Sequence, residues 1–289
     1  MIEWITCIGL LSAATCLLIF LYFAIGIFLQ NKIMAKEQPL VSVVVAAHNE
    51  SLSISSCLDC LLTQNYPQDK MEIIIVNDRS EDKTGLVLSE YKRKYPNIQV
   101  ITINDCKDGL SPKKNAISKG IAVATGEIIA TTDADCEPPE TWLSTLIPYF
   151  TPKTGMVIGL APLITTTWWL SPFISVDAII AGLTAFATLG WRHAVACTGR
   201  NISYRKIVFD EVNGYDGISH ILTGDDDLFM QKIAQNTDWD IRFSCDGEAS
   251  VPSLTPNGWA HFITQRKRHI SGAKYFPKPV QIGYSLFFI

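Results

Sequence analysis

Four short apolar runs, separated by polar stretches of helical length, constrain the fold of this chain most strongly. The runs are LVSVVVAA at 40–47, MEIIIV at 71–76, IQVITI at 98–103 and EIIATT at 127–132. Helix-like segments at 51–64, 82–95 and 113–125 lie between them. Parallel strands need such crossovers, and a sheet covered on both faces has nearly continuous Val and Ile strands. The pattern predicts an α/β, nucleotide-binding type of half-domain over 40–135.

Composition narrows the class of protein and its partners. Of 289 residues, 48% are hydrophobic and 18% are charged, which is ordinary for a folded protein and does not favour disorder. The net charge of -4 gives no global attraction to nucleic acid, so we expect no nucleic-acid partner. Eight cysteines are scattered, and Cys57-x-x-Cys60 has no second Cys or His pair to complete a zinc site, so we expect reduced thiols.

The N-terminal segment is typical of a membrane anchor. From Trp4 to Leu29 there are 26 residues without a formal charge. They would form about 39 Å of helix at about 1.5 Å per residue, enough to span a bilayer. Glu3 precedes the run and Lys32 follows it, which favours an uncleaved anchor over a cleavable signal peptide. Because Lys32 and Lys36 follow the span and no Lys or Arg precedes it, we expect the rest of the chain in the cytoplasm.

A second apolar segment covers 157–191, where only Asp177 is formally charged. Pro162 and Pro172 interrupt its first half, so we favour a core or membrane-facing interfacial helix from about 172 to 189 over a second span. The final run, QIGYSLFFI at 281–289, is too short to span a bilayer. We interpret it as the start of a further, truncated membrane segment.

Polar side chains follow three of the four predicted strands. They are His48, Asn49 and Glu50 after the first, Asn77 and Asp78 after the second, and Asp133 and Asp135 after the fourth. Ligands of such sheets bind beyond the carboxyl ends of the strands. These residues are therefore the first candidates for a binding site.

Asp133 and Asp135 are one residue apart and suit a hard divalent cation, Mg²⁺ or Mn²⁺, which prefers oxygen ligands. Such an ion usually takes its remaining ligands from phosphate and water, so a diphosphate-bearing substrate is expected. The alternative is that Asp135 only caps a helix that opens at Pro138.

A second acidic run, LTGDDDLFMQKIA at 222–234, leads into a helix-like stretch. One of its three aspartates is suited to be an N-cap and one to favour the helix dipole. Another is suited to be a general base that deprotonates an acceptor hydroxyl.

Two further stretches are weaker signals. In ACTGRNISYRK at 196–206, Gly199 permits close backbone approach and Arg200 and Asn201 add donors, although a plain turn and strand explains the stretch equally well. HFITQRKRHISGAKY at 261–275 is basic. Its charge suits either a diphosphate or anionic lipid at a nearby membrane.

In this order, these stretches resemble glycosyltransferase family 2, the GT-A-fold group that includes membrane synthases of the cellulose, hyaluronan and ceramide-glucosyltransferase kind. The resemblance runs from about Val41 to Tyr275 and implies a Rossmann-like, mostly parallel sheet. VVAAHNE matches a strand ending in hNE, and VNDRSEDKT matches the VDDgSxDxT segment that holds the uracil base. The resemblance implies donor contacts from Ala47, Asn49, Glu50 and Asp78.

The remaining motifs of the family imply the other roles. SPKKNAISKG places Lys113, or its neighbour Lys114, near the diphosphate. DAD becomes the DxD motif, with Asp133 towards the ribose and metal and Asp135 as the direct metal ligand. TGDDDL matches TEDxDL with Gly224 in place of Glu, which makes Asp225 the catalytic base and Asp226 the fallback.

The QxxRW motif of the family corresponds to QRKRH at 265–269. It implies that Gln265 and Arg268 contact the donor diphosphate and that His269 replaces the aromatic residue of the acceptor side. This departure puts polymer synthesis in doubt more than transfer itself. Gly199, Arg200 and Asn201 complete the implied acceptor side.

We therefore expect a transmembrane helix over 1–30, a linker over 31–39 and a GT-A domain over 40–275. The domain divides into a nucleotide-binding half, 40–135, and an acceptor-side half, 136–275, before the membrane segment that starts within 276–289. The expected activity is inverting transfer from a nucleotide sugar, with UDP favoured, to a lipid-linked or glycan acceptor at the cytoplasmic membrane face.

Two other functions compete with this expectation. A magnesium-dependent phosphotransferase of the haloacid dehalogenase kind carries DxDx[TV] after its first strand, whereas DADCE follows the fourth and lacks that hydroxyl or Val. A membrane-tethered nucleotide-sugar binder or assembly partner that has lost activity is suggested by Gly224 and His269. Retention of Asp225 argues against it.

Overall fold

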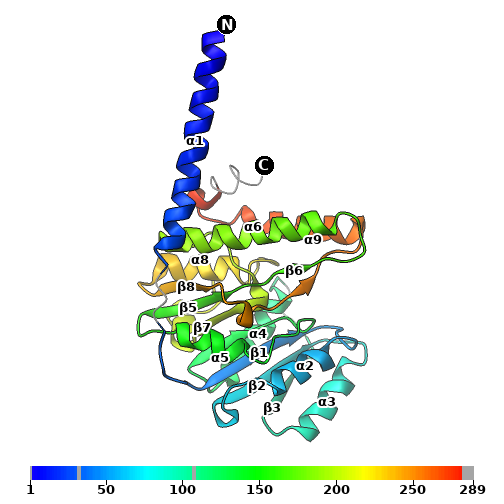
Figure 1. Cartoon of the computed structure of the whole chain (residues 1–289). Helices are drawn as coiled ribbons and strands as arrows, with labels where there is room; N and C mark the ends of the chain where they lie inside the picture. Colours follow the sequence, from blue (N-terminus) through cyan, green and yellow to red (C-terminus); the bar gives the residue numbers. More distant parts are fainter. Residues whose placement is uncertain (1, 31–33, 106–108, 282–289) are drawn as a thin grey trace.

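The computed structural model describes residues 2–30, 34–105 and 109–281, without the side chains of residues 2, 3, 269 and 270. A seven-stranded sheet lies beneath a long N-terminal helix (Figure 1). Its strands are β1 (Val41–Ala47), β2 (Met71–Asp78), β3 (Ile98–Ile103), β4 (Ile128–Thr131), β5 (Thr154–Gly159), β7 (Ile202–Arg205) and β8 (Asp240–Ser244). A separate parallel pair joins β6 (Leu163–Ile164) to β9 (Ser253–Leu254).

The strand order is β3-β2-β1-β4-β7-β5-β8. The four predicted strands are β1 to β4, and the pairings among them are all parallel. β7 runs antiparallel to both of its neighbours, β4 and β5, while β5 and β8 are parallel to each other. The predicted mostly parallel α/β sheet is therefore confirmed.

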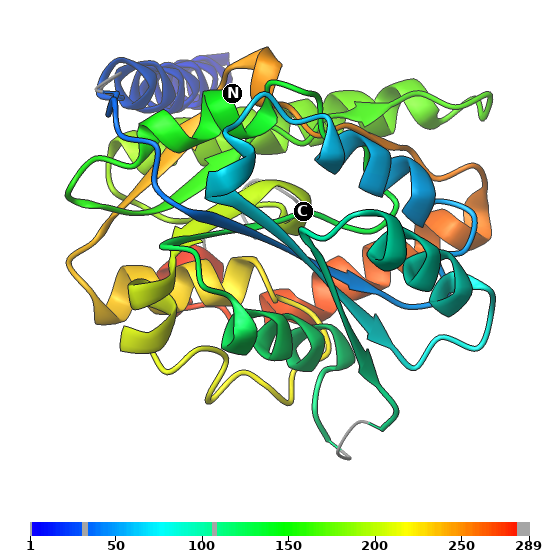
Figure 2. The same cartoon turned by 90° about the horizontal axis from the view of Figure 1, so that it is seen from below.

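Helices cover both faces of the sheet, as Figure 2 shows from below. On one face, α2 (Ile54–Leu62), α3 (Thr84–Lys94) and α5 (Trp142–Leu146) pack on Val43, Val45 and their neighbours. On the other face, α4 (Pro112–Val123), α7 (Lys206–Glu211) and α8 (Asp227–Asn236) pack on Val44 and Ile74. Because both faces are buried, the strands need apolar residues at every position, which is why they read as continuous runs.

The segment after β4 corrects one alternative from the sequence. α5 begins at Trp142, with Thr141 at its N-cap position, so no helix opens at Pro138. Asp135 is consequently not a helix cap. The side chain at this position is exposed and lies at the carboxyl end of β4.

Two described helices, α1 (Ile2–Phe28) and α6 (Ser171–Gly190), are long and apolar enough to cross a membrane by length and composition alone. The two pack on each other, and Gly26 and Gly190 lie at the crossing, where backbone meets backbone. The Trp191 indole stacks on Tyr22 with ring centroids 5.3 Å apart and donates a 2.9 Å hydrogen bond to the carbonyl of Tyr22. The C-terminal part of α1 is therefore packed against the domain.

The predicted chain divisions stay predictions. Part of the linker at 31–39 and residues 282–289 of the expected C-terminal membrane segment lie outside the described residues. α9 (Trp259–Ala273) covers most of the basic stretch at 261–275.

Candidate active site

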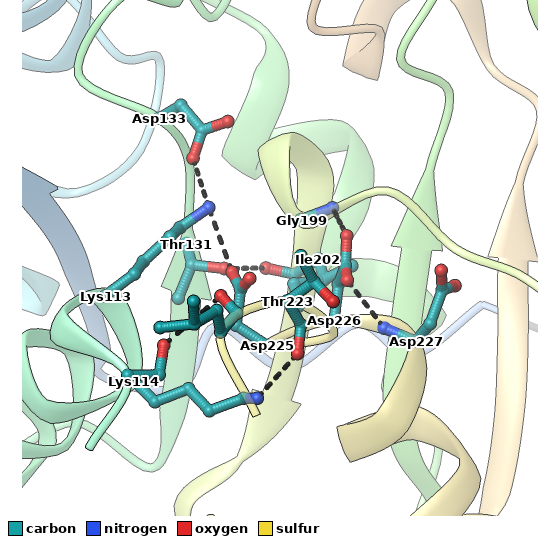
Figure 3. A network of polar contacts seen from close by, with 12 residues as sticks. Lys113, Lys114, Thr131, Asp133, Gly199, Ile202, Thr223, Asp225, Asp226 and Asp227 are labelled. Carbon is teal, nitrogen blue, oxygen red and sulfur yellow. Dashed lines mark hydrogen bonds and ion pairs between the residues drawn. The ribbon is translucent and has the colours of Figure 1, made fainter. Parts of the chain in front are cut away.

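Several of the predicted site residues come together at the carboxyl edge of the sheet. Asp133 follows β4, and Lys113 lies in the first turn of α4, after β3. Because β7 is antiparallel and pairs Ile202 with Thr131, the turn before β7 lies at this same edge. The loop before α8 adds Asp225 to it (Figure 3).

Lys113 links the two acidic motifs. Its Nζ lies 2.8 Å from Oδ1 of Asp133 and 2.9 Å from Oδ2 of Asp225, as Figure 3 shows. Burial lowers the pKa of Lys113, but the two carboxylates outweigh it and hold the pKa well above its usual value. A fixed positive charge therefore lies between the DxD residues and the proposed base.

Lys114, the neighbouring candidate, faces away from these carboxylates. Its buried Nζ donates hydrogen bonds to the carbonyls of Ile218, Ile221 and Thr223, at 3.0, 2.6 and 2.7 Å. These bonds fix the loop that precedes Asp225. The structure thus gives the two adjacent lysines different environments, and it is Lys113 that faces the site.

The three consecutive aspartates also differ. Asp226 is the N-cap of α8 and accepts hydrogen bonds from the amides of Asp227 and Gly199, each at 2.7 Å. Asp227 accepts a 2.6 Å hydrogen bond from the amide of Cys197. Burial raises the pKa of both carboxyls, and the charge of each neighbouring aspartate adds to the effect.

Asp225 is the aspartate that faces Lys113, and its side chain is 15% exposed. Burial raises its pKa, but Lys113 outweighs this effect and holds the net pKa below the usual value. Of the three carboxylates, it is therefore the one that stays ionised most readily. That is the state a general base needs.

Gly224 has a physical reason for departing from the family pattern. Its φ is +74°, a conformation that residues with a Cβ rarely adopt. An added Cβ would also lie 2.6 Å from Cγ of Leu228. This backbone geometry disfavours Glu at position 224, so the departure from the family pattern has a local conformational reason.

The donor set after β4 fits a hard divalent cation. Single ligand atoms of Asp133, Asp135 and Cys136 lie within 4.8 Å of one another. Burial raises the pKa of the Cys136 thiol to about 12, and Asp133 and Asp135 add to the effect. A sulfur ligand is also a poor match for a hard cation, which prefers oxygen. The two carboxylates are the available oxygen ligands, and Mg²⁺ or Mn²⁺ is the ion that they suit.

The ends of β1 and β2 form the opposite side of the same edge. Asp78 is almost fully buried, and both of its carboxylate oxygens accept from the Arg79 guanidinium at 2.8 and 3.0 Å. His48 Nδ1 lies 2.6 Å from the carbonyl oxygen of Asp78. Asn49 adopts a φ of +59° and accepts a 2.8 Å hydrogen bond from the amide of Glu81.

Ala47 is the buried last residue of β1. Glu50, three residues later, interacts electrostatically with the DxD residues. Burial raises the pKa of Glu50, and the charges of Asp135 and Asp133 raise it further, against a hydrogen bond from Ser53. A bound cation between these carboxylates would relieve that repulsion.

The residues expected on the acceptor side differ in what they contact. The Gly199 amide donates to Asp226, and Arg200 donates a 2.9 Å hydrogen bond to the carbonyl of Ala161. Asn201 is fully buried, accepts from the Trp142 indole and donates to the carbonyls of Leu160 and Ala249. The structure thus gives Asn201 a packing role and no exposed group for an acceptor.

The residues of the QxxRW-like stretch lie on α9. Arg268 is exposed and Gln265 is half-buried, and the structure brings neither into contact with Asp133 or Asp225 among the described residues. The side chain of His269 lies outside the described part of the chain. The C-terminal end of α9 does approach the site loop, because Gly272 lies against Thr223.

Arg79 is a site residue that the sequence reasoning missed. It occupies the position of the small residue in VDDgSxDxT and adopts a φ of +54°, as a glycine there would. The departure from the family pattern was the available signal. A nucleobase that forms hydrogen bonds with Asp78 would share its carboxylate with the Arg79 guanidinium.

Two open pockets lie elsewhere. One of about 390 Å³ is bounded by α1, α6 and α8, and one of about 460 Å³ by α4 and α7. The site carboxylates line neither, so the Asp133–Lys113–Asp225 network is not part of either pocket.

Comparison with known proteins places these features in a family. The model of "Glycosyl transferase family 2" matches residues 42–212. A relative named "Probable glycosyltransferase YdaM", from Bacillus subtilis, is 29% identical over 244 residues, which are 83% of this chain and 56% of that protein. The chain thus spans little more than half the length of this relative.

Two solved structures share the fold. The mannosyltransferase PcManGT from Pyrobaculum calidifontis, in complex with GDP-Man and Mn²⁺, has a TM-score of 0.69 at 20% identity over 94% of this chain and 75% of its own. TarS 1-349 from S. aureus, in complex with UDP-GlcNAc, has a TM-score of 0.54 at 18% identity over 78% of this chain and 60% of its own. At these identities the likeness shows the GT-A fold.

Proposed function

The chain belongs to glycosyltransferase family 2, and from that membership we propose that it transfers a sugar from a nucleotide diphosphate donor to an acceptor hydroxyl at a membrane. The observation that carries the proposal is the bridge of Lys113 between Asp133 and Asp225. It joins the side that suits a diphosphate to the carboxylate that suits an acceptor proton. UDP is the favoured nucleotide, because the Asp78 segment resembles the one that holds uracil, although one structural neighbour holds GDP-Man.

In this reaction the acceptor oxygen forms a bond to the anomeric carbon, and Asp225 takes the hydroxyl proton. The bond from the anomeric carbon to the diphosphate oxygen breaks, its electron pair leaves with the nucleoside diphosphate, and the configuration inverts. Lys113 is placed to neutralise charge on the leaving group. Asp133 and Asp135 would hold Mg²⁺ or Mn²⁺, which would stabilise the same developing charge when bound.

We also propose where in the cell the protein acts. α1 would be an uncleaved membrane anchor with the catalytic domain on the cytoplasmic face, and the acceptor would be lipid-linked or a glycan presented there. The exposed, uncharged surface of α1 and the basic residues that follow it in the sequence support this placement.

Transfer from a panel of labelled UDP- and GDP-sugars to membrane lipids and glycans tests the proposal. For Asp225→Asn we expect a loss of about 10²- to 10⁴-fold in turnover, as for removal of a general base. Asp210→Asn, an exposed aspartate on α7, is the control and should leave turnover unchanged. Nucleotide binding that survives in Asp225→Asn would show that the variant is folded, and undiminished turnover in that variant would contradict the assignment of the base.

A further inference from the structure

A band of exposed apolar side chains runs along α6 and onto α9. We define the α6–α9 face as Trp169, Phe173, Val176, Ile180, Leu183 and Trp259, each of which is at least half exposed. Phe173, Val176, Ile180 and Leu183 recur at intervals of three and four residues, so they form one stripe of α6. The opposite stripe, with Ile174, Ala185 and Leu189, is buried in the domain.

Contacts of α9 with α6, and with the two tryptophans just before α6, make this face one surface. Trp259 packs edge-on against Trp168 at 5.5 Å and lies 6.5 Å from Trp169, measured between ring centroids. Arg266 of α9 forms an ion pair with Asp177 of α6. The only acidic residue of α6 is thereby partly neutralised by its neighbour.

The face lies where α1 leaves the domain. Residues 4–21 of α1 are all exposed and uncharged, and from Tyr22 onward the helix begins to contact the domain through Trp191. Those 18 exposed residues span about 27 Å, close to the roughly 30 Å hydrocarbon core of a bilayer. α6 runs across the line of α1 at this level (Figure 1). A bilayer that accommodates α1 therefore meets α6 broadside.

Charge points to the kind of bilayer. The chain has 28 acidic residues, and all of them precede residue 249. From there to residue 281 the basic residues are Arg266, Lys267, Arg268, Lys274 and Lys278. A protein with a net charge of -4 thus concentrates positive charge beside the apolar stripe of α6, which is the arrangement that anionic headgroups attract.

We propose that the α6–α9 face lies in the headgroup and outer acyl region of an anionic phospholipid bilayer, with α6 in the plane of the membrane. Tryptophan at the rim and an apolar stripe beside basic residues are the features of an interfacial helix. α6 is then not a second span, although its length would allow one. The inference rests on the membrane placement within the proposed function and is independent of the transfer reaction.

The placement has a consequence for the site. The chain leaves α6 at Gly190 and reaches the Cys197 and Gly199 amides, which bind Asp227 and Asp226, within nine residues. The helix on the bilayer and the loop of the base are therefore joined by one short, hydrogen-bonded segment. An acceptor embedded in the same leaflet would reach Asp225 from that side.

Site-specific photocrosslinking in vesicles tests the proposal with the full chain. The probe p-benzoylphenylalanine replaces Phe173, Ile180 or, as a positive control, Leu11 of α1; Leu86 of α3 and Ile207 of α7 are exposed controls on other surfaces. In vesicles of phosphatidylcholine with phosphatidylglycerol, we expect lipid adducts at Phe173→Bpa, Ile180→Bpa and Leu11→Bpa, and none above background at the two controls.

The outcomes separate this inference from the proposed function. Adducts at position 11 but not at 173 or 180 would overturn the inference and leave the α1 anchor standing. No adduct at position 11 would overturn the membrane placement itself. Adducts of position 180 at the ends of the acyl chains would show that α6 crosses the bilayer, and crosslinks to a second copy would make the face a protein interface; both results overturn the proposal.

A charge arm tests the headgroup. The triple variant Lys267→Gln, Lys274→Gln, Lys278→Gln should lose the excess of adducts at position 173 that phosphatidylglycerol vesicles give over pure phosphatidylcholine. The matched triple Lys92→Gln, Arg93→Gln, Lys94→Gln removes the same charge from the far end of α3 and should keep that excess. Equal losses in both triples would overturn the assignment of these lysines to the anionic surface.

Discussion

At the scale of single residues, Lys113 is the centre of the site. Among the described residues it is the one cation that contacts both Asp225 and Asp133, so it links the proposed base to the proposed DxD motif. A bound diphosphate or cation at Asp133 would compete for this contact. Lys113 would then change partners during the reaction, while Lys114 keeps the loop in place.

Lys113→Met is expected to move the acid limb of the pH profile of kcat/KM to higher pH. Burial raises the pKa of Asp225, and Lys113 is the main effect that holds it below its usual value. A base must be deprotonated, so without Lys113 activity is lost at a higher pH as the solution becomes more acidic. We also expect a drop of about 10²- to 10³-fold at neutral pH, since a donor to the leaving group is removed.

Lys113→Met should also change how the free energy of unfolding depends on pH, because it removes the main effect that lowers the pKa of Asp225. A carboxyl with a lowered folded pKa stabilises the native state above its unfolded pKa of about 3.9, and this contribution disappears as pH falls through the folded value. Lys119→Met, an exposed change on the same helix, is the control for both profiles. An acid limb that stays at its wild-type position in Lys113→Met would contradict the coupling.

At the scale of elements, the first half of the fold follows from local pattern and the second half does not. Each βα unit over 40–131 is a contiguous apolar run and an amphipathic helix, so periodicity alone identifies it. β7 instead enters between β4 and β5 with reversed direction, and nothing in ISYR specifies that neighbour. Long-range pairing of this kind is determined by tertiary packing and cannot be predicted from the segment alone.

The site shows the same division between local and tertiary information. Strand-end reasoning points to Asp133, because parallel strands share their carboxyl ends. Lys113 and Asp225 are added only by the family resemblance, and the structure brings all three together at one edge. The sequence leaves Lys113 and Lys114 unresolved, since only the loop at 218–223 decides which lysine is buried under carbonyls. It also cannot show that Asn201 is held by Trp142, a partner 59 residues away.

The crossing of α1 and α6 gives a prediction at this scale. A Cβ at Gly190 would lie 1.8 Å from the carbonyl oxygen of Gly26, so Gly190→Leu must separate the two helices. We expect a lower thermal midpoint in detergent and loss of the Tyr22–Trp191 stacking, seen as a change in tryptophan emission. Gly182→Leu lies on the same helix with nothing within 4 Å of an added Cβ.

The control makes the sign of the effect informative. Replacing Gly by Leu within a helix favours the helix by about 0.8–1 kcal/mol, so Gly182→Leu should be neutral or stabilising. If the two variants have the same thermal midpoint, the packing of α1 on α6 contributes nothing to stability. The conclusion that the C-terminal part of α1 is packed against the domain would then be wrong.

At the scale of the whole molecule, the site is assembled from segments that are far apart in the sequence. The ends of β1, β2 and β4, the start of α4 and the loop before α8 all contribute, so the proposed donor site would exist only when the sheet is complete. A ligand that binds only the folded chain stabilises all of it. Binding can therefore be measured as stability, without a known acceptor.

We expect UDP with Mn²⁺ to raise the free energy of unfolding by about 2.7 kcal/mol at a hundredfold excess over Kd, because only the folded state binds. For a chain of this size that is a rise in thermal midpoint of about 4–5 °C. EDTA should remove most of the rise, since Asp133 and Asp135 would then face the diphosphate as like charges. Differential scanning fluorimetry with UDP, GDP and neither nucleotide makes the comparison.

Variants locate this effect in the structure. Asp135→Asn should remove the Mn²⁺-dependent part, whereas Asp69→Asn, an exposed aspartate at the amino end of β2, should keep it. Stabilisation by GDP and not by UDP would overturn the choice of uracil as the donor's nucleobase and would leave the metal assignment intact. An equal rise with EDTA and with Mn²⁺ would instead remove the metal from donor binding, and Lys113 would then be the main group that neutralises the diphosphate.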